Sequence, residues 1–254
     1  MRVAALYDIH GNLPALRAVL ADVDALACDT IVIGGDVALG PMPRETLDLL
    51  ATRGDQVRFI RGNCDRVMGS VLERAPDHSK SWEPLARWAA ERVTPAQRAF
   101  LGGLPTTLEL DVEELGTVLF FHGTPRSDVE IITRVSLESR LVPILSEVGP
   151  HVLVCGHTHV QYDRNVLAKR LINAGSVGRP YEAEPGAYWC LLGPAVELRR
   201  TVYDVVEAAR EIRASRYPDV ENFISSNEPD PSLPGKTSEF FESKALEQES
   251  PPRD

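Results

Sequence analysis

Several short apolar runs in this 254-residue chain end on a polar side chain that can bind a metal ion. The clearest is Val32-Ile33-Gly34-Gly35-Asp36, in which β-branched residues predict a buried strand and two glycines allow a sharp turn before the carboxylate. Side chains that follow strands of an open α/β sheet point into the crevice where such sheets hold ligands. A chain with repeated endings of this kind is expected to form an α/β fold with one polar site at the sheet edge.

Four other runs end in the same way, at Asp8-Ile9-His10-Gly11, Gly62-Asn63-Cys64-Asp65, Phe121-His122-Gly123 and Gly156-His157-Thr158-His159. Each motif alone is weak evidence, because Asp, Asn and His also occupy turns and helix caps. All of them together, each at a predicted strand end, predict a site for two metal ions with Asp36 at its centre. The other histidines, His78 and His151, are interpreted as structural or solvent-facing.

Hydrophobic patterning predicts alternating strands and helices over residues 2–60, which is typical of a largely parallel sheet. Residues 66–105 are expected to be helical. A hairpin at 107–121 predicts a second sheet with antiparallel strands, and further short strands are expected at 151–155, 160–166, 169–173, 186–192 and 196–203. Proline, serine and acidic residues dominate after about residue 223. We therefore predict a domain over 1–223 and a disordered acidic tail over 224–254.

Composition restricts the partners and the compartment. The net charge is −10, so a basic surface for nucleic acid is not indicated. We find no secretory signal pattern and no apolar stretch near the roughly 18 residues that a membrane span needs. The four cysteines are widely spaced, which is typical of a reduced compartment. We expect a cytoplasmic protein with no membrane contact, whose exposed edge strands would allow a homo-oligomer.

Taken together, the motifs resemble the calcineurin-like metallophosphoesterase superfamily over roughly residues 1–205, and within it the YfcE-type phosphodiesterase branch. The signature of that branch is similar to Gly62-Asn63-Cys64-Asp65 and to Asn173-Ala174-Gly175-Ser176-Val177-Gly178. The resemblance implies a four-layer α/β/β/α sandwich of two mixed sheets flanked by helices, with the site between the sheet edges. It also implies that one ion is held by Asp8, His10, Asp36 and His159, and the other by Asp36, Asn63, His122 and His157.

The chemistry of these side chains agrees with that division. Nitrogen and oxygen ligands without a thiolate suit Mn²⁺, our first choice, or Fe, Ni²⁺, Co²⁺ or Zn²⁺. A shared carboxylate holds two ions about 3.5–4 Å apart, the separation that two-metal phosphoester chemistry uses. A water bridging the ions would lose a proton near neutral pH and attack phosphorus in line with the leaving oxygen. We therefore expect a phosphodiesterase acting on a small phosphoester, with Asp36, Asn63, Cys64 and Asp65 as catalytic residues.

Cys64 stands where many superfamily members have a histidine that is thought to protonate the leaving group or bind the phosphate. A thiol of ordinary pKa, about 8.5, is a poor proton donor to an alkoxide. This predicts weak activity on alkyl monoesters and better activity on diesters and aryl esters. Whether Cys64 has any catalytic part stays open, and we favour a space-filling role.

Two further residues are candidates for substrate binding, Arg126 through its guanidinium fork and Asn173 through the signature that it begins. Two other functions remain open. One is a non-catalytic scaffold resembling the retromer scaffold subunit, which keeps the fold but has a degraded site. The other is a protein phosphatase acting on phospho-Ser/Thr, against which the missing histidine at Cys64 argues.

Overall fold

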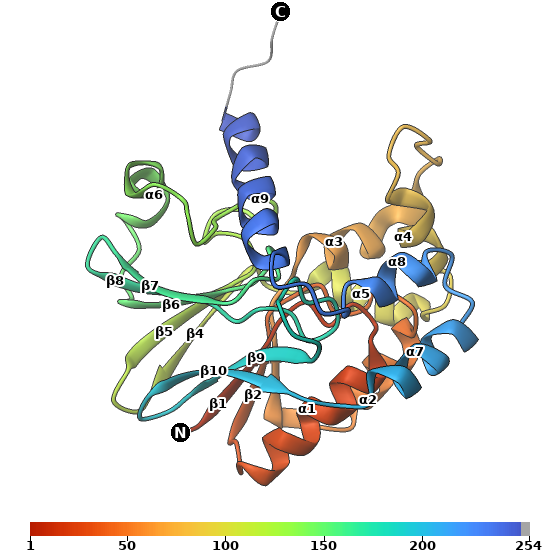
Figure 1. Cartoon of the computed structure of the whole chain (residues 1–254), viewed down its shortest axis with the longest axis horizontal. Coiled ribbons are helices and arrows are strands. Elements are labelled where there is room, and N and C mark those ends of the chain that lie inside the picture. Colours follow the sequence, from red (N-terminus) through yellow and green to blue (C-terminus); the bar gives the residue numbers. More distant parts are fainter. Residues whose placement is uncertain (250–254) are drawn as a thin grey trace, which may run out of the picture.

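The computed structural model describes residues 1–249 and contains two five-stranded sheets packed face to face (Figure 1). In the first sheet β1 pairs in parallel with β2, and β2 with β3, while β9 and β10 are added antiparallel beyond β1. Its strand order is β10-β9-β1-β2-β3. The strands are β1 (Val3–Leu6), β2 (Thr30–Ile33), β3 (Val57–Phe59), β9 (Ala187–Leu192) and β10 (Val196–Thr201).

The second sheet has a parallel centre, β5-β6-β8, between two antiparallel edge strands, and its order is β4-β5-β6-β8-β7. Its strands are β4 (Thr107–Val112), β5 (Gly116–Phe121), β6 (Val152–Cys155), β7 (Tyr162–Val166) and β8 (Lys169–Asn173). Apolar side chains of both sheets, among them Val3, Val32, Phe120 and Val154, form the core between them. The buried Tyr7 hydroxyl donates to the Val154 carbonyl at 2.9 Å and joins the two sheets below the polar edge.

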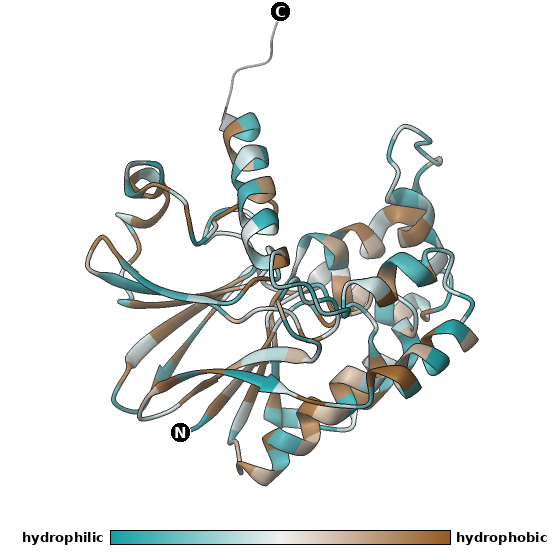
Figure 2. Ribbon diagram, in the orientation of Figure 1, coloured by the Kyte–Doolittle hydropathy of each residue, from teal (hydrophilic) through white to brown (hydrophobic). Residues whose placement is uncertain are grey.

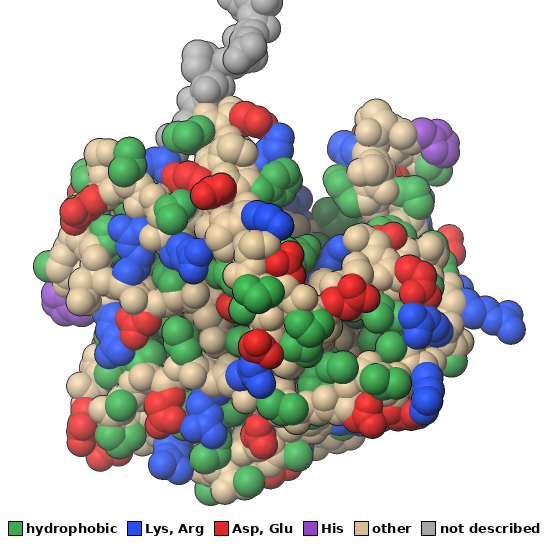
Figure 3. All heavy atoms as spheres, viewed as in Figure 1, with side chains coloured by type: hydrophobic (Ala, Val, Ile, Leu, Met, Phe, Trp, Pro, Cys, Tyr) green, Lys and Arg blue, Asp and Glu red, His purple; other side chains and the backbone are tan. Residues whose placement is uncertain are grey.

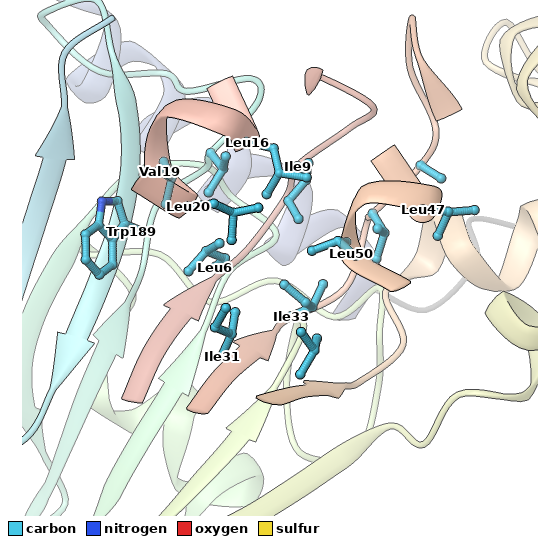
Figure 4. Close-up of a cluster of buried hydrophobic side chains, with 14 of the residues drawn as sticks. Leu6, Ile9, Leu16, Val19, Leu20, Ile31, Ile33, Leu47, Leu50 and Trp189 are labelled. Atoms are coloured by element: carbon cyan, nitrogen blue, oxygen red, sulfur yellow. The ribbon is translucent and has the colours of Figure 1, made fainter. Parts of the chain in front are cut away.

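Helices cover the outer face of each sheet. Figure 4 shows Leu16, Val19 and Leu20 of α1 (Leu13–Ala25) packed over strand residues Leu6 and Ile31. α2 (Pro43–Ala51) adds Leu47 and Leu50 to the same cluster. On the opposite side, α6 (Glu138–Leu145) packs its apolar residues against the second sheet. The predicted four-layer α/β/β/α sandwich is therefore confirmed.

Further helices connect or flank these layers, and Figure 2 shows that they carry both polar and apolar residues. They are α3 (Asn63–Ser70), α4 (Glu83–Ala90), α5 (Pro95–Gly103), α7 (Val205–Ala214), α8 (Val220–Ser225) and α9 (Leu233–Glu249). Two short 3₁₀ turns lie at Gly54–Gln56 and Val71–Glu73. Within residues 1–249 no helix is both long and apolar enough to cross a lipid bilayer.

The chain after residue 223 corrects the prediction of a disordered tail. Figure 1 shows α9 standing beside the ends of the second sheet. The carboxylate of Glu242 accepts hydrogen bonds from Thr133, Ser136 and Arg140, and Ala245 is buried. This polar segment is therefore a helix packed against the rest of the protein, because one of its acidic side chains accepts hydrogen bonds from three residues of the preceding domain. The remainder of the predicted tail, residues 250–254, lies outside the described part of the chain.

Candidate metal centre

Each of the seven predicted ligands follows a strand within a few residues. Asp8 and His10 come after β1, Asp36 after β2, and Asn63 at the start of α3 after β3. The others are His122 after β5, and His157 and His159 after β6. Ligand atoms of Asp8, His10 and His159 lie within 4.8 Å of one another, as do those of Asp8, Asp36 and His122. The two sheets therefore bring side chains from distant parts of the sequence into one cluster.

An unusual backbone conformation sets the direction of five of the candidate ligand side chains. The φ angle is positive at Asp8 (53°), His10 (49°), Asp36 (54°), His157 (70°) and His159 (59°). Such angles are uncommon for residues other than glycine, and each costs on the order of 1–3 kcal/mol. Hydrogen bonds between the loops hold this conformation, for example from Asp8 N to Gly35 O (3.1 Å) and from His10 N to Asp36 O (2.9 Å). In a regular strand Asp8 and His10 would share a face, but the left-handed turn decides where each points.

Hydrogen bonds also fix how three imidazoles face the cluster. The Nδ1 atoms of His10, His122 and His159 lie 3.1, 2.9 and 2.6 Å from the carbonyl oxygens of Leu39, Gly34 and Arg179. A carbonyl can only accept, so each Nδ1 carries a proton, and in the neutral imidazole the lone pair is then on Nε2. The three Nε2 atoms face the carboxylates, which is the orientation that outer partners impose on metal-binding histidines.

The donor set has unused acceptor atoms that fit a cation. Asp8 Oδ1 is buried without a hydrogen-bond partner, 3.3 Å from His159 Nε2 and 3.8 Å from His10 Nε2. Asp36 Oδ2 lies 3.8 Å from His10 Nε2 and 3.6 Å from His122 Nε2, so this carboxylate stands between the two sides of the cluster. The Asn63 amide lies 3.2 Å from His122 Nε2, and with its oxygen turned inward it faces only acceptors. Lone pairs that converge in this way are satisfied by divalent metal ions.

Charge within the cluster supports the same conclusion. Burial, and then the neighbouring histidines, lower the pKa of His10 and His157 to about 4, so both imidazoles are neutral and able to ligate. Burial also lowers the pKa of His122, but the Asp36 and Asp8 carboxylates outweigh it and raise that pKa to about 10. The carboxylates therefore favour positive charge at this point.

Asp65 connects the loop that follows β2 with the loop that follows β3. Its buried carboxylate accepts from the backbone N–H of Asp36 (2.7 Å), Val37 (3.0 Å) and Gly62 (2.9 Å). The loops approach so closely that a Cβ on Gly62 would lie 2.1 Å from Asp36 Oδ1. These contacts place Asp65 where it can position the Asp36 loop, and the catalytic part expected of it stays a prediction.

Cys64 lies beside the cluster with its backbone N–H donating to Asp36 Oδ1 at 2.8 Å. Burial first, and then the charge of Asp36, raise the pKa of this thiol well above its ordinary value. It is therefore a weaker acid than the sequence suggested, which strengthens the argument against proton donation or thiolate attack. Any part that Cys64 takes in a reaction stays a prediction.

The two predicted substrate-binding residues are engaged by neighbouring protein groups, and their part in binding a substrate stays a prediction. Arg126 binds both carboxylate oxygens of Glu130 (2.9 and 2.5 Å) and donates to Pro143 O. Asn173 is fully buried; its amide nitrogen donates to Gly156 O and Thr158 Oγ1, and its oxygen accepts from Gly175 N. Its role is to shape the loop that carries His157 and His159, because no part of it reaches the surface.

A cavity lies next to the cluster, and sequence reasoning did not define its shape or its full lining. A cavity of about 640 Å³ has His10 and Asn63 in its wall, together with Trp82, Arg179, Tyr217 and Phe223. In Figure 3 the surface is hollowed next to the segment that leads into α4, at the upper right. Pocket walls were expected from residues 66–105 and 124–135, and both segments contribute, but the sequence did not single out Arg179, which directly follows the signature that ends at Gly178.

Comparisons with known proteins agree with this fold. The chain is 28% identical over 237 residues to the uncharacterized protein MJ0912 of Methanocaldococcus jannaschii, covering 85% of this chain and 94% of that relative. The crystal structure of the hypothetical protein PH1004 from Pyrococcus horikoshii superposes with a TM-score of 0.75 at 22% identity, over 91% of this chain and 99% of that one. A metallophosphoesterase from Sphaerobacter thermophilus gives a TM-score of 0.69 at 23% identity, over 90% and 99% of the two chains.

A family model covers most of the sequence. The model of the calcineurin-like phosphoesterase superfamily domain matches residues 1–192, a span that contains all seven candidate ligands. The expected resemblance is thereby confirmed. With its fold, its cluster of Asp and His side chains and this match in agreement, the chain belongs to the calcineurin-like phosphoesterase superfamily.

Proposed function

We propose that this protein is a phosphodiesterase that uses two divalent metal ions, with Mn²⁺ as the first candidate. The observation that carries the proposal is the convergence of three imidazole Nε2 atoms on two buried carboxylates, one of which has an oxygen with no hydrogen-bond partner. Asp8, His10, Asp36 and His159 would hold one ion, and Asp36, Asn63, His122 and His157 the other. Asp36 suits the shared position because its Oδ2 stands between His10 and His122.

Bound ions of this kind supply a nucleophile at neutral pH and neutralise the phosphoryl oxygens. The protein's own residues set the geometry. Backbone carbonyls hold His10, His122 and His159 in the tautomer that ligates. Asp65 holds the Asp36 loop, and Asn63 would contribute an oxygen without adding negative charge. The Cys64 thiol is a poor proton donor, so we propose a preference for diesters or aryl esters with good leaving groups, such as p-nitrophenolate, which depart without an added proton.

The first test is hydrolysis of bis-p-nitrophenyl phosphate by metal-stripped protein, with and without added Mn²⁺. We expect activity only with metal, and a loss of roughly 100-fold or more in Asp36→Asn, because that variant removes the shared charged ligand. Asp111→Asn is the matched control, since Asp111 is exposed on the β4–β5 hairpin and accepts only from Thr117 there.

The same experiment separates the alternatives. Metal binding measured by calorimetry without any hydrolysis under Mn²⁺, Ni²⁺ or Zn²⁺ would contradict the enzyme and favour the scaffold. Rapid release of phosphate from a phosphoserine peptide would favour the protein phosphatase instead. Activity that follows both metal loading and Asp36 supports the phosphodiesterase.

A further inference from the structure

The cavity beside the metal centre is lined by basic side chains, and only some of them are neutralised. Arg66 forms a bidentate pair with Asp128 (2.8 and 3.0 Å). Two more basic residues of the wall form ion pairs with carboxylates that do not line the cavity: Arg74 with Glu83 at 2.7 Å, and Lys80 with Asp77 at 3.3 Å. The fourth is Arg179, and within residues 1–249 no carboxylate oxygen lies within 4.0 Å of its guanidinium.

Arg179 also has an unsatisfied donor. Its Nε is buried and makes no hydrogen bond within the described structure, and its nearest aromatic contact is the ring of Phe223, 6.0 Å from Cζ. A π face attracts the cation weakly but offers no lone pair to that N–H. A buried guanidinium donor without a partner is costly, so it indicates a position that an acceptor fills when a ligand is bound.

The backbone fixes Arg179 relative to the metal centre. Its carbonyl accepts from Nδ1 of the candidate ligand His159 at 2.6 Å, and its N–H donates to Ser176 Oγ at 2.8 Å. Ser176 Oγ in turn donates to Asp8 O at 2.7 Å. The residue that supports one metal ligand through its backbone therefore directs its side chain into the cavity that contains His10.

The rest of the wall is aromatic and apolar. Trp82, Leu85, Tyr217 and Phe223 line the cavity, whose volume of about 640 Å³ lies within the range of small-molecule sites. No Asp or Glu occurs in the described wall, so an anion meets no opposing charge there. Tyr217 is held rigidly by edge-on contacts with Trp88 (5.2 Å) and Phe223 (5.9 Å between ring centroids). Such a wall suits a flat ring next to a phosphate.

We infer that Arg179 binds a phosphate oxygen of the substrate, and that the aromatic wall holds a ring system attached to that phosphate, as in a nucleoside phosphodiester. The inference rests on the proposed function for the reaction itself, but the binding part stands on Arg179 and the cavity alone. Guanidinium groups bind phosphate through two N–H groups in a fixed fork, which a lysine ammonium does not reproduce.

The test is calorimetric binding of adenosine 5′-monophosphate and of ribose 5-phosphate, which lacks the base, to the Mn²⁺-loaded protein. Arg179→Met is expected to weaken both ligands roughly 10- to 100-fold, as for loss of a hydrogen bond to a charged group. Arg179→Lys should restore part of the affinity. Trp82→Ala should weaken only adenosine 5′-monophosphate, by roughly 5-fold or more, because stacking is lost. Arg44→Met, an exposed arginine of α2 that pairs with Asp48, is the matched control.

Each outcome has a distinct meaning if metal content and circular dichroism are the same in all variants. Unchanged affinities in both Arg179 variants overturn the phosphate assignment. Equal binding of the two ligands by the wild type, or no binding at millimolar concentration, overturns the assignment of the ring site. Binding that depends on Arg179 in a protein that does not hydrolyse bis-p-nitrophenyl phosphate supports this inference and overturns only the proposed catalysis.

Discussion

Asp65→Asn tests how the metal centre is held together. The Asp65 carboxylate is fully buried and accepts three backbone N–H groups, two through Oδ2 (from Asp36 and Gly62) and one through Oδ1 (from Val37). An asparagine keeps one oxygen for the first two donors, but its NH₂ group then faces the Val37 N–H. That donor loses the only acceptor it has among residues 1–249, and the remaining bonds lose their charge assistance.

The size of the effect follows from these contacts. An unsatisfied buried donor costs about 1–3 kcal/mol, and charge-assisted bonds are about twice as strong as neutral ones. We expect Asp65→Asn to lower the free energy of unfolding by about 2–4 kcal/mol. Because Asp65 also holds the Asp36 loop, the affinity for Mn²⁺ should fall about 10- to 100-fold, as when an outer partner of a metal ligand is removed.

Guanidinium denaturation followed by circular dichroism measures the first quantity, and Mn²⁺ titration calorimetry measures the second. Both measurements should be made above pH 8, where Asp65 is ionised, because burial and the nearby Asp36 raise its pKa to about 7. The control Asp111→Asn should stay within about 0.5 kcal/mol of wild type, as is usual for surface positions. If Asp65→Asn keeps both its stability and its Mn²⁺ affinity, Asp65 does not position the Asp36 loop.

Three further predictions concern other parts of the molecule. Cys64→His should raise activity on alkyl phosphomonoesters by about 10-fold or more while changing diester hydrolysis little, because it supplies a proton donor of suitable pKa. In metal-free protein, pKa values of about 4 at His10 and His157 mean that stability falls as the pH drops from 6.5 to 4; the pKa of about 10 at His122 means that it also falls as the pH rises from 6.5 to 10. Urea denaturation should therefore show a maximum near pH 6.5, and metal loading should remove the alkaline decline. Glu242→Ala should release α9 and increase its proteolysis roughly 10-fold or more, because three donors lose a charged acceptor.

Each of these three predictions has its own contradicting outcome. An unchanged monoesterase rate in Cys64→His would show that the thiol does not limit proton transfer. A metal-free protein whose stability rises steadily from pH 6.5 to 10 would exclude a protonated His122. For α9 the control is Glu247→Ala, since Glu247 is exposed and pairs only with Lys244 of the same helix among its described contacts. Equal cleavage of the two variants would mean that Glu242 does not secure the helix.

The clustering of the candidate ligands was predictable because their signal is local. An apolar run followed by glycine and a metal-binding side chain marks the end of a buried strand, and the ends of parallel strands meet at one sheet edge. For this reason Asp8, Asp36 and His122 were expected together although they are far apart in the sequence. The family resemblance supported the four-layer arrangement, which local patterning alone would not have distinguished from a single doubly wound sheet.

Other features depended on contacts that no local pattern contains. The left-handed backbone at Asp8 and His10 is held by the neighbouring Gly35 and Asp36 carbonyls, so its direction follows from loop packing. Arg126 is neutralised by Glu130, whereas Arg179 faces the cavity with an unused donor. Both arginines follow glycine-containing motifs; Arg126 has Glu130 four residues further along the chain, whereas the surroundings of Arg179 come from distant segments.

The C-terminal segment after residue 223 also depends on contacts that its own composition does not predict. Its composition is that of a disordered segment, yet Glu242 finds Thr133, Ser136 and Arg140 on the body, and this contact favours a helix. The sequence alone determined which side chains could bind metal and roughly which strands would carry them, because those properties depend on residue type and on neighbours along the chain. Tertiary structure decided the direction of each candidate ligand, that Arg179 lines the cavity beside them and that α9 is ordered, because each depends on contacts between segments far apart in the sequence.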